Sequence, residues 1–188
     1  MNNKDDIIAQ GALTQFAKFG LRKTTMQDVA DEAGISRQTL YNRVPNKDAL
    51  LRLVAKYYFD DNIGRCRHTL DNCTDMASAW DVLIQHFIIE VWQTVNAMPE
   101  AEAFEMSANQ VISEEVAYAA KQKIALIAQT ISTFSVTDHS HSPEDIGRFF
   151  CAVAMGIKHT ATDEASLMAL TGTLKDALIR LGGTASAS

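Results

Sequence analysis

Apolar residues recur at helical spacing along almost the whole chain, and this periodicity restricts the possible folds more than any other feature. No run shows a strict alternation of apolar and polar residues, and the chain contains only three prolines. We therefore expect an all-α fold of about nine helices. No apolar run approaches the roughly 20 residues that a membrane helix needs. The polar, acidic N-terminus lacks the pattern of a secretory signal, so we expect a cytoplasmic protein without a membrane partner.

Glycine, proline and capping residues divide this helical pattern into segments. The first predicted helix runs from about Asp5 to Phe19 and stops at Gly20, a residue that ends helices readily. Pro45 breaks the chain before a longer helix from near Lys47 to Arg65, and we expect residues 66–76 to form a connector. The other predicted helices follow Thr25 and Ser36, span about Ala77 to Ala97, begin near Ser113, begin at Ser142-Pro143, and end before Gly182.

Charge is distributed unevenly along the chain, and the distribution bears on the partner. The formal net charge is −6, which by itself argues against a nucleic-acid ligand. Residues 18–56, however, carry 8 basic and 4 acidic residues, whereas residues 66–188 carry 7 basic and 15 acidic residues. A polyanion would be attracted to the N-terminal part and repelled by the rest, so the asymmetry is compatible with DNA binding.

The segment from Thr24 to Val44 has the spacing of a helix-turn-helix. Small Ala30 suits the crossing of two short helices, Gly34 can adopt a positive φ in the turn, and Leu40 anchors the second helix from beneath. The outward residues of that second helix are then Arg37, Gln38, Tyr41 and Asn42. Arginine can pair with guanine, and glutamine or asparagine with adenine, in the major groove. Thr25, Tyr41 and Lys47 could donate hydrogen bonds to phosphates.

These residues resemble the tetracycline-repressor (TetR) family. The likeness covers roughly residues 5–58 and is carried by Phe19-Gly20, Thr24 to Ala30, Ala33 to Ser36, Thr39 to Tyr41 and Asn46 to Leu50. It implies a DNA-binding head for residues 1–46 and a ligand-binding and dimerisation body for 47–188, with the body's first helix linking the two. Arg43 and Val44 depart from the family pattern, which often has His and an aromatic residue there. The DNA-contacting positions implied by the resemblance are Thr25, Gln27, Ser36, Arg37, Gln38, Thr39, Tyr41, Asn42 and Lys47.

The resemblance further implies a repressor that binds a near-palindromic operator as a homodimer and is released by a small-molecule effector. The last two helices offer broad apolar faces for the dimer interface: Phe149, Phe150, Val153, Ile157, Leu170, Leu174 and Leu178. The same faces could instead pack inside one subunit. We expect the effector to contact His86, Glu90, Trp92 and Tyr118, although the first two could also form the solvent face of their helix.

Other classes of function have less support in the sequence. Cys66, His68 and Cys73, or His139 and His141, lack the paired spacing of a structural zinc site, so we expect no metal and no cofactor. Catalytic motifs such as a phosphate-binding loop or a nucleophile elbow are absent from the sequence. A helical adaptor that binds only protein, and an all-α enzyme that uses His86 and Glu90, remain the alternatives. The basic helix after Ser36 distinguishes the regulator from both.

Overall fold

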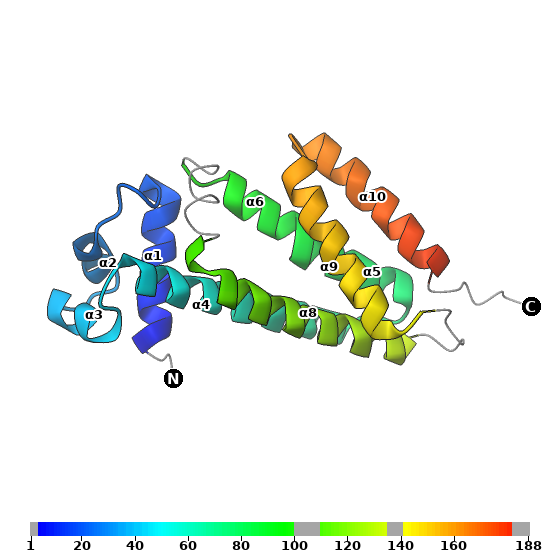
Figure 1. Ribbon diagram of the computed structural model, residues 1–188, viewed down its shortest axis with the longest axis horizontal. Coiled ribbons are helices and arrows are strands. Elements are labelled where there is room, and N and C mark those ends of the chain that lie inside the picture. Colours follow the sequence, from blue (N-terminus) through cyan, green and yellow to red (C-terminus); the bar gives the residue numbers. More distant parts are fainter. Residues whose placement is uncertain (1–3, 100–109, 135–140, 182–188) are drawn as a thin grey trace, which may run out of the picture. The chain divides into compact units, whose positions relative to one another are not determined.

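The computed structural model describes residues 4–99, 110–134 and 141–181, and this part of the chain is helical with no β-strand in it (Figure 1). The predicted all-α class is therefore confirmed. In the same residues, every helix is either too short or too polar to cross a lipid bilayer. The predicted segment after Pro99, the loop that contains His139 and the tail after Gly182 lie outside the described residues.

The chain folds into two compact units. The first contains residues 1–61 and 93–119, and the second contains residues 62–92 and 120–188. The first unit therefore extends beyond the head predicted for residues 1–46. Leu50, Leu51 and Val54, at the start of the helix after Pro45, are buried in the same core as the head, and Val111 and Ile112 pack against this core. Burial of apolar surface thus joins residues from both sides of the predicted boundary.

Three short-to-medium helices make the head of the first unit. They are α1 (Lys4–Phe19), α2 (Met26–Glu32) and α3 (Arg37–Arg43), and α4 (Lys47–Leu70) follows them. α1 packs on α2, and α2 packs on α3. The common core is built from apolar side chains at helical spacing: Ile8, Ala9, Ala12, Phe16, Val29, Ala30, Leu40 and Val44.

The second unit contains the C-terminal part of α4 and most of the remaining helices. These are α5 (Met76–Ile84), α6 (Glu90–Asn96), α8 (Ser113–Phe134), α9 (Pro143–Thr160) and α10 (Glu164–Leu181), of which α6 and α8 also contribute to the first unit. α9 and α10 lie side by side (Figure 1), and α10 also packs on α5. Trp80 and Phe150 stack in the core with their ring centroids 5.9 Å apart.

Two helical boundaries differ from the prediction. α4 continues to Leu70, so the first five residues of the predicted connector 66–76 are helix. Cys66 and Leu70 are buried and extend the apolar stripe of Ile63, which the polar residues between them conceal in the sequence. The helix predicted for about Ala77 to Ala97 contains a π-helical segment, Gln85–Ile89, between α5 and α6. A π turn inserts one extra residue into the helix. Because this segment is apolar around most of its circumference, its periodicity could not reveal the insertion.

Candidate nucleic-acid interface

The turn between α2 and α3 has the geometry that its sequence predicts. Gly34 has a φ of +65°, in the left-handed region that glycine adopts at little cost. The backbone amide of Ile35 donates to the carbonyl of Ala30 at 3.0 Å, which closes the turn. The side chains of Ala30 and Leu40 are fully buried where α3 packs on the head. The small Ala30 suits this close packing. The closed turn and the buried side chains together fix the orientation of α3.

Both short helices are capped at their N-termini. The Ser36 hydroxyl accepts a hydrogen bond from the backbone amide of Thr39 at 3.1 Å. Thr25 and Asp28 form a capping box, in which the Thr25 amide donates to the Asp28 carboxylate at 2.7 Å. Hydrogen bonds from the Thr25 backbone and side chain lower the pKa of Asp28, so this carboxylate is ionised at neutral pH. The caps satisfy amides that a seven-residue helix would otherwise leave unpaired.

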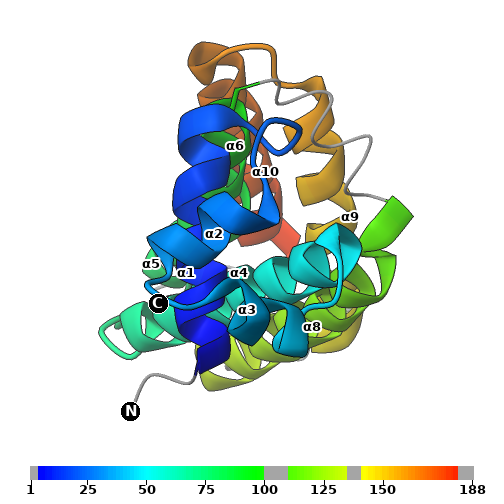
Figure 2. The same cartoon turned by 90° about the vertical axis from the view of Figure 1, so that its left-hand side faces the viewer.

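The solvent face of α3 carries the polar side chains that the sequence predicted there. Arg37, Gln38, Tyr41 and Asn42 are exposed, while Thr39 is half-buried beside its cap. The Arg37 guanidinium lies over the ring of Tyr41, 5.3 Å from its centroid, and also donates to its hydroxyl at 3.5 Å. Figure 2 shows α2 and α3 next to each other on the side of the head that faces the viewer. The arrangement offers donors and acceptors on one helix face, supported by a buried underside.

Three of the residues expected to contact phosphates or bases already have partners within the chain. The Thr25 hydroxyl donates to Asp28 at 2.7 Å, and the Gln27 amide donates to Asp31 at 2.7 Å. The Lys47 ammonium donates to the backbone carbonyl of Thr24 at 2.8 Å, and burial lowers its pKa. Lys47 therefore stabilises the loop before α2 and is only half-exposed for an external anion.

The loop held by Lys47 contains two cations that sequence reasoning did not include. Arg22 and Lys23 are exposed immediately before Thr24, and Lys47 also lies 3.5 Å from the carbonyl oxygen of Arg22. The signal was present in the sequence as two adjacent basic residues before the first helix of the motif. Cations so close to the N-terminus of α2 are suited to contact a phosphate backbone.

The two departures from the TetR pattern have clear structural roles. Val44 is 4% exposed and belongs to the core of the head. Arg43 forms an ion pair with Asp5 of α1 at 3.5 Å. Because both side chains of this pair are partly exposed, it contributes little to stability. It does direct the Arg43 side chain toward α1.

The expected effector residues His86 and Glu90 lie together in the second unit. His86 is 7% exposed, with Nδ1 3.2 Å from the Glu90 carboxylate and Nε2 3.3 Å from the Thr69 hydroxyl. Arg65 of α4 donates to the same Glu90 carboxylate at 2.9 Å. The pair is thus part of a network that joins α4 to the π segment, and is not a solvent face.

Trp92 and Tyr118, the other two expected effector residues, each have a contact within their own unit. The indole of Trp92 is half-buried and donates to the carbonyl of Ala161 at 3.2 Å. Tyr118 belongs to the first unit, is 44% exposed, and has the ammonium of Lys56 5.3 Å from its ring centroid. Tyr118 thus belongs to the first unit, whereas His86, Glu90 and Trp92 belong to the second.

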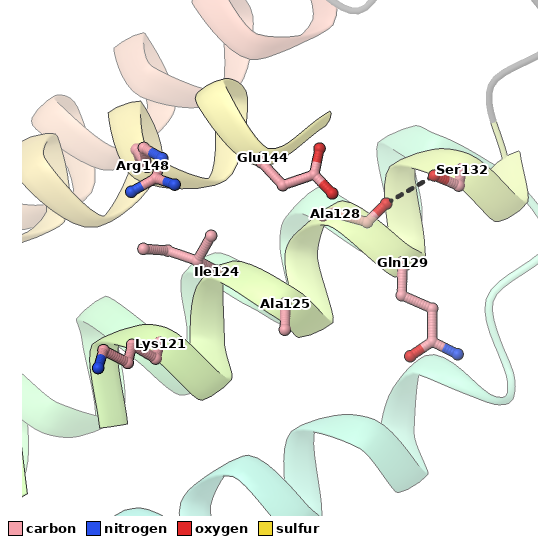
Figure 3. Close-up of a pocket in the computed structure, with 8 residues that line it drawn as sticks. All are labelled: Lys121, Ile124, Ala125, Ala128, Gln129, Ser132, Glu144 and Arg148. Atoms are coloured by element: carbon pink, nitrogen blue, oxygen red, sulfur yellow. Dashed lines mark hydrogen bonds between the residues drawn. The ribbon is translucent and has the colours of Figure 1, made fainter. Parts of the chain in front are cut away.

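A groove on the surface of the second unit lies between α8 and α9 (Figure 3). Its volume is about 580 Å³. At Gly147 the two helices approach closely, because an added Cβ there would lie 3.1 Å from the carbonyl oxygen of Ile124. None of the predicted effector residues lines the groove. The lining residues are Lys121, Ile124, Ala125, Ala128, Gln129, Ser132, Glu144 and Arg148.

The predicted dimer residues divide into two groups. Phe150, Ile157, Leu174 and Leu178 are at most 5% exposed within a single chain, so they belong to its core. Apolar periodicity identifies an apolar face but not which neighbour covers it, so the dimer role of these four stays a prediction. Phe149 is 44% exposed, and Val153 and Leu170 are half-buried.

α9 and α10 nevertheless leave large apolar side chains exposed. They include Phe149 and two methionines, Met155 and Met168, which are 53% and 54% exposed. Gly156 and Gly172 lie on the same helices, and a Cβ added to either would have no atom within 4 Å. We call these exposed positions of α9 and α10, Phe149, Met155, Gly156, Met168 and Gly172, the outer apolar face.

Comparisons with known proteins match this geometry. Residues 8–54 match the family model described as bacterial regulatory proteins of the tetR family. The chain is 36% identical over 72 residues to the transcriptional repressor KstR2 of Mycolicibacterium smegmatis, a match that covers 38% of this chain and only 35% of that repressor. This chain thus spans about a third of the length of that relative.

Two solved structures share the fold at low sequence identity. The reduced form of Escherichia coli NemR has a TM-score of 0.69 at 12% identity, with 98% of this chain and 100% of that chain covered. Bacillus subtilis FadR in complex with stearoyl-CoA has a TM-score of 0.62 at 14% identity, with 92% and 96% covered. Residues 8–54 therefore carry a DNA-binding motif of the tetR family type, and these two structures show that the chain shares their fold.

Proposed function

We propose that this protein is a repressor that binds a near-palindromic DNA operator as a homodimer and releases it when a small-molecule effector binds the second unit. The observation that carries the proposal is the exposed face of α3, where Arg37, Gln38, Tyr41 and Asn42 project from a helix whose underside is buried. A helix of this kind fits the major groove, and these side chains can distinguish base edges.

Positioning of α3 would come from contacts to the phosphate backbone. The exposed cations Arg22 and Lys23 lie beside the start of α2, and Lys47 holds their loop through the carbonyl of Thr24. The excess of basic residues in this part of the chain supplies the electrostatic, sequence-independent share of the affinity. Because Thr25 and Gln27 have internal partners, their contacts to DNA would require the exchange of one hydrogen bond for another.

The homodimer would form through the outer apolar face of α9 and α10. A single seven-residue recognition helix gives a small DNA interface, and a two-fold dimer doubles it by reading two half-sites. Exposed Phe149 and Met168 supply apolar area, whereas Gly156 and Gly172 permit the helices of the second copy to approach closely.

Release by an effector is supported by the ligands found in solved proteins with this fold. The solved FadR structure holds stearoyl-CoA, and another structure with this fold, that of SmeT, is a complex with triclosan. In our proposal the dimer has one state that binds DNA and one that does not. The effector has the higher affinity for the state that does not bind DNA. An effector with equal affinity for both states would leave operator binding unchanged.

Selection from random double-stranded DNA with the full-length protein tests the proposal directly. We expect enrichment of a near-palindrome whose half-site centres are separated by about one helical turn or a multiple of it, 10–10.5 base pairs. Enrichment of a single half-site would contradict the dimer. The absence of any enriched sequence, together with affinity that is independent of salt, would favour the adaptor alternative.

A further inference from the structure

The groove between α8 and α9 is built on one stripe of α8. Its lining residues on that helix recur at intervals of three and four, so they share one helix face: Lys121, Ile124, Ala125, Ala128, Gln129 and Ser132. We call Ile124, Ala125 and Ala128 the apolar floor. The volume of about 580 Å³ lies within the range of about 300–1,000 Å³ that is usual for small-molecule sites.

Side chains of opposite charge line the groove from α9. Glu144 and Arg148 are four residues apart, which corresponds to about 6 Å along the helix axis. In Figure 3, Arg148 lies toward the Lys121 end of the groove and Glu144 lies toward the Ser132 end. The groove therefore has two cations at one end and a carboxylate nearer the other end, with the apolar floor between them.

The charged groups of the groove are not held by strong contacts within the chain. The side chains of Lys121 and Glu144 are exposed and form no ion pair or hydrogen bond with other residues in the described part of the chain. Arg148 lies at the limit of an ion pair with Asp145, with Nε 4.0 Å from the carboxylate, and the two side chains are 69% and 65% exposed. Such an exposed pair is weak, so all three groups can bind a ligand at little cost.

The two helices that line the groove also take part in the proposed regulation. α8 begins in the first unit, where Glu115 forms an ion pair with Arg52 of α4 at 3.3 Å, and its residues from 120 onward belong to the second unit. α9 carries Phe149 of the outer apolar face directly after Arg148. A ligand that bridges α8 and α9 would therefore act on a helix that continues into the unit with the helix-turn-helix, and on a helix of the proposed dimer face.

We propose that this groove is the effector site and that it takes a short linear ligand with an acid group at one end and an amino group at the other. The acid group accepts hydrogen bonds from Lys121 and Arg148, and the ammonium group donates to Glu144. The apolar chain of the ligand covers the apolar floor between them. This inference rests on the proposed function, because it specifies the chemical class of the effector. It assigns effector recognition to α8 and α9, and not to His86 and Glu90.

Three six-carbon probes separate recognition of the two charges. 6-Aminohexanoate carries both charges, hexanoate carries only the acid, and hexylamine carries only the ammonium group. Each probe is titrated into the full-length protein with labelled alanine methyl groups, and binding is followed by NMR. The methyl signals of Ala125 and Ala128 report on the groove, whereas that of Ala9, buried in the core of the head, is the internal reference.

We expect the unaltered protein to bind 6-aminohexanoate more tightly than either of the other probes. Arg148→Met should weaken the binding of 6-aminohexanoate and hexanoate by about twofold to fivefold, the range for exposed charge pairs, and leave hexylamine binding unchanged. Glu144→Gln should weaken 6-aminohexanoate and hexylamine by a similar factor and leave hexanoate binding unchanged. Arg180→Met is the matched control and should retain all binding, because Arg180 is exposed on α10 of the same unit but does not line the groove.

Several results would overturn the assignment. These are the absence of any shift at Ala125 and Ala128 with 6-aminohexanoate, equal loss of all three probes in Arg148→Met or Glu144→Gln, and loss of binding in Arg180→Met. If no probe binds and Arg148→Met is a monomer in sedimentation, the groove is an interface between two copies of the chain, which also overturns it. Thermal unfolding of each variant verifies that a lost signal reflects the site and not the fold.

Operator binding with and without 6-aminohexanoate distinguishes failure of this inference from failure of the proposed function. We expect the probe to lower the affinity for the selected operator in the unaltered protein, and to do so less in Glu144→Gln. If the protein binds the operator but none of the probes, only this inference is wrong. If it binds no operator, the proposed function is wrong. If 6-aminohexanoate binds in the groove but leaves operator affinity unchanged, the groove is not the effector site, which also contradicts the inference.

Discussion

Residues of the helix-turn-helix differ in whether their polar groups already have partners inside the chain. Gln38 and Asn42 project from α3 into solvent, whereas Thr25 and Lys47 bond to neighbouring atoms of the head. The exposed side chains of Gln38 and Asn42 lose only their hydration when they bond to bases. The engaged groups instead determine the position of the loops from which α2 and α3 begin. A substitution should therefore affect DNA binding alone in the first group, and both stability and DNA binding in the second.

Lys47→Met tests this distinction. The variant removes the donors to the carbonyls of Thr24 and Arg22, so we expect the free energy of unfolding to fall by about 0.5–1.5 kcal/mol. Because the loop carries Arg22 and Lys23, affinity should fall for specific and scrambled DNA alike. Urea unfolding and DNA titration measure the two effects. Lys23→Met is the control, and it should weaken DNA binding without the loss of stability. Unchanged stability in Lys47→Met would mean that Lys47 is only a phosphate contact.

Much of this residue-level description follows from the sequence. The outward set on α3, the caps at Thr25 and Ser36, and the glycine turn are local features, and the structure has each of them. Contacts between distant residues could not be predicted in the same way. The bond from Lys47 to Thr24 joins residues 23 positions apart, and the ion pair between Arg43 and Asp5 depends on how α3 packs on α1.

The arrangement of the helices depends on a few backbone positions with special conformations. Gly34, in the turn between α2 and α3, is the clearest example. An alanine there would meet no neighbouring atom, so its cost comes from the positive φ alone. We expect Gly34→Ala to lower the free energy of unfolding by about 1–2 kcal/mol. Gly34→Asn should cost less, because asparagine tolerates this conformation better.

Gly64 provides a matched comparison for the turn. It lies inside α4, where an added Cβ also has no atom within 4 Å. Gly64→Ala should therefore stabilise the protein by up to about 1 kcal/mol through helix propensity. Chemical unfolding of both variants measures the difference. If both glycine-to-alanine changes had the same sign, the left-handed turn would not be the reason for glycine at position 34.

Element boundaries show where sequence patterns stop being informative. The polar run after Arg65 predicted a connector, yet Cys66 and Leu70 continue the buried stripe of α4. In the same way, the π segment leaves no mark in the apolar period, although the bond from Asn62 to His86 shows its effect on the packing. Both features arise from packing between helices, which a one-dimensional pattern does not contain.

The whole molecule, in our proposal, requires two copies that meet at the outer apolar face. Phe149→Glu would place a charge on this face without altering the core, because the side chain is 44% exposed in one chain. We expect sedimentation to show a monomer and operator affinity to fall by about tenfold or more, since a monomer contacts only one half-site. Tyr118→Glu changes an equally exposed aromatic residue of the first unit and should leave the dimer intact. A dimer that persists in Phe149→Glu would exclude this face.

The sequence alone could not assign residues to the dimer interface of the whole molecule. Four of the seven predicted dimer residues are core residues, and the face available to a partner includes methionines and glycines that no apolar stripe singled out. Apolar periodicity could not separate a face covered by the same chain from a face left for a second chain. Exposure in the folded subunit provides that information.

The most direct test of the central claim is the affinity of Arg37→Ala for variants of the selected operator, measured by fluorescence anisotropy over a range of salt concentrations. If Arg37 reads a guanine, the variant should lose about 1–3 kcal/mol on the operator and no longer discriminate at one base pair of each half-site. Its affinity for scrambled DNA should change far less. Equal losses on operator and scrambled DNA, or discrimination that remains at every position, would contradict recognition by α3.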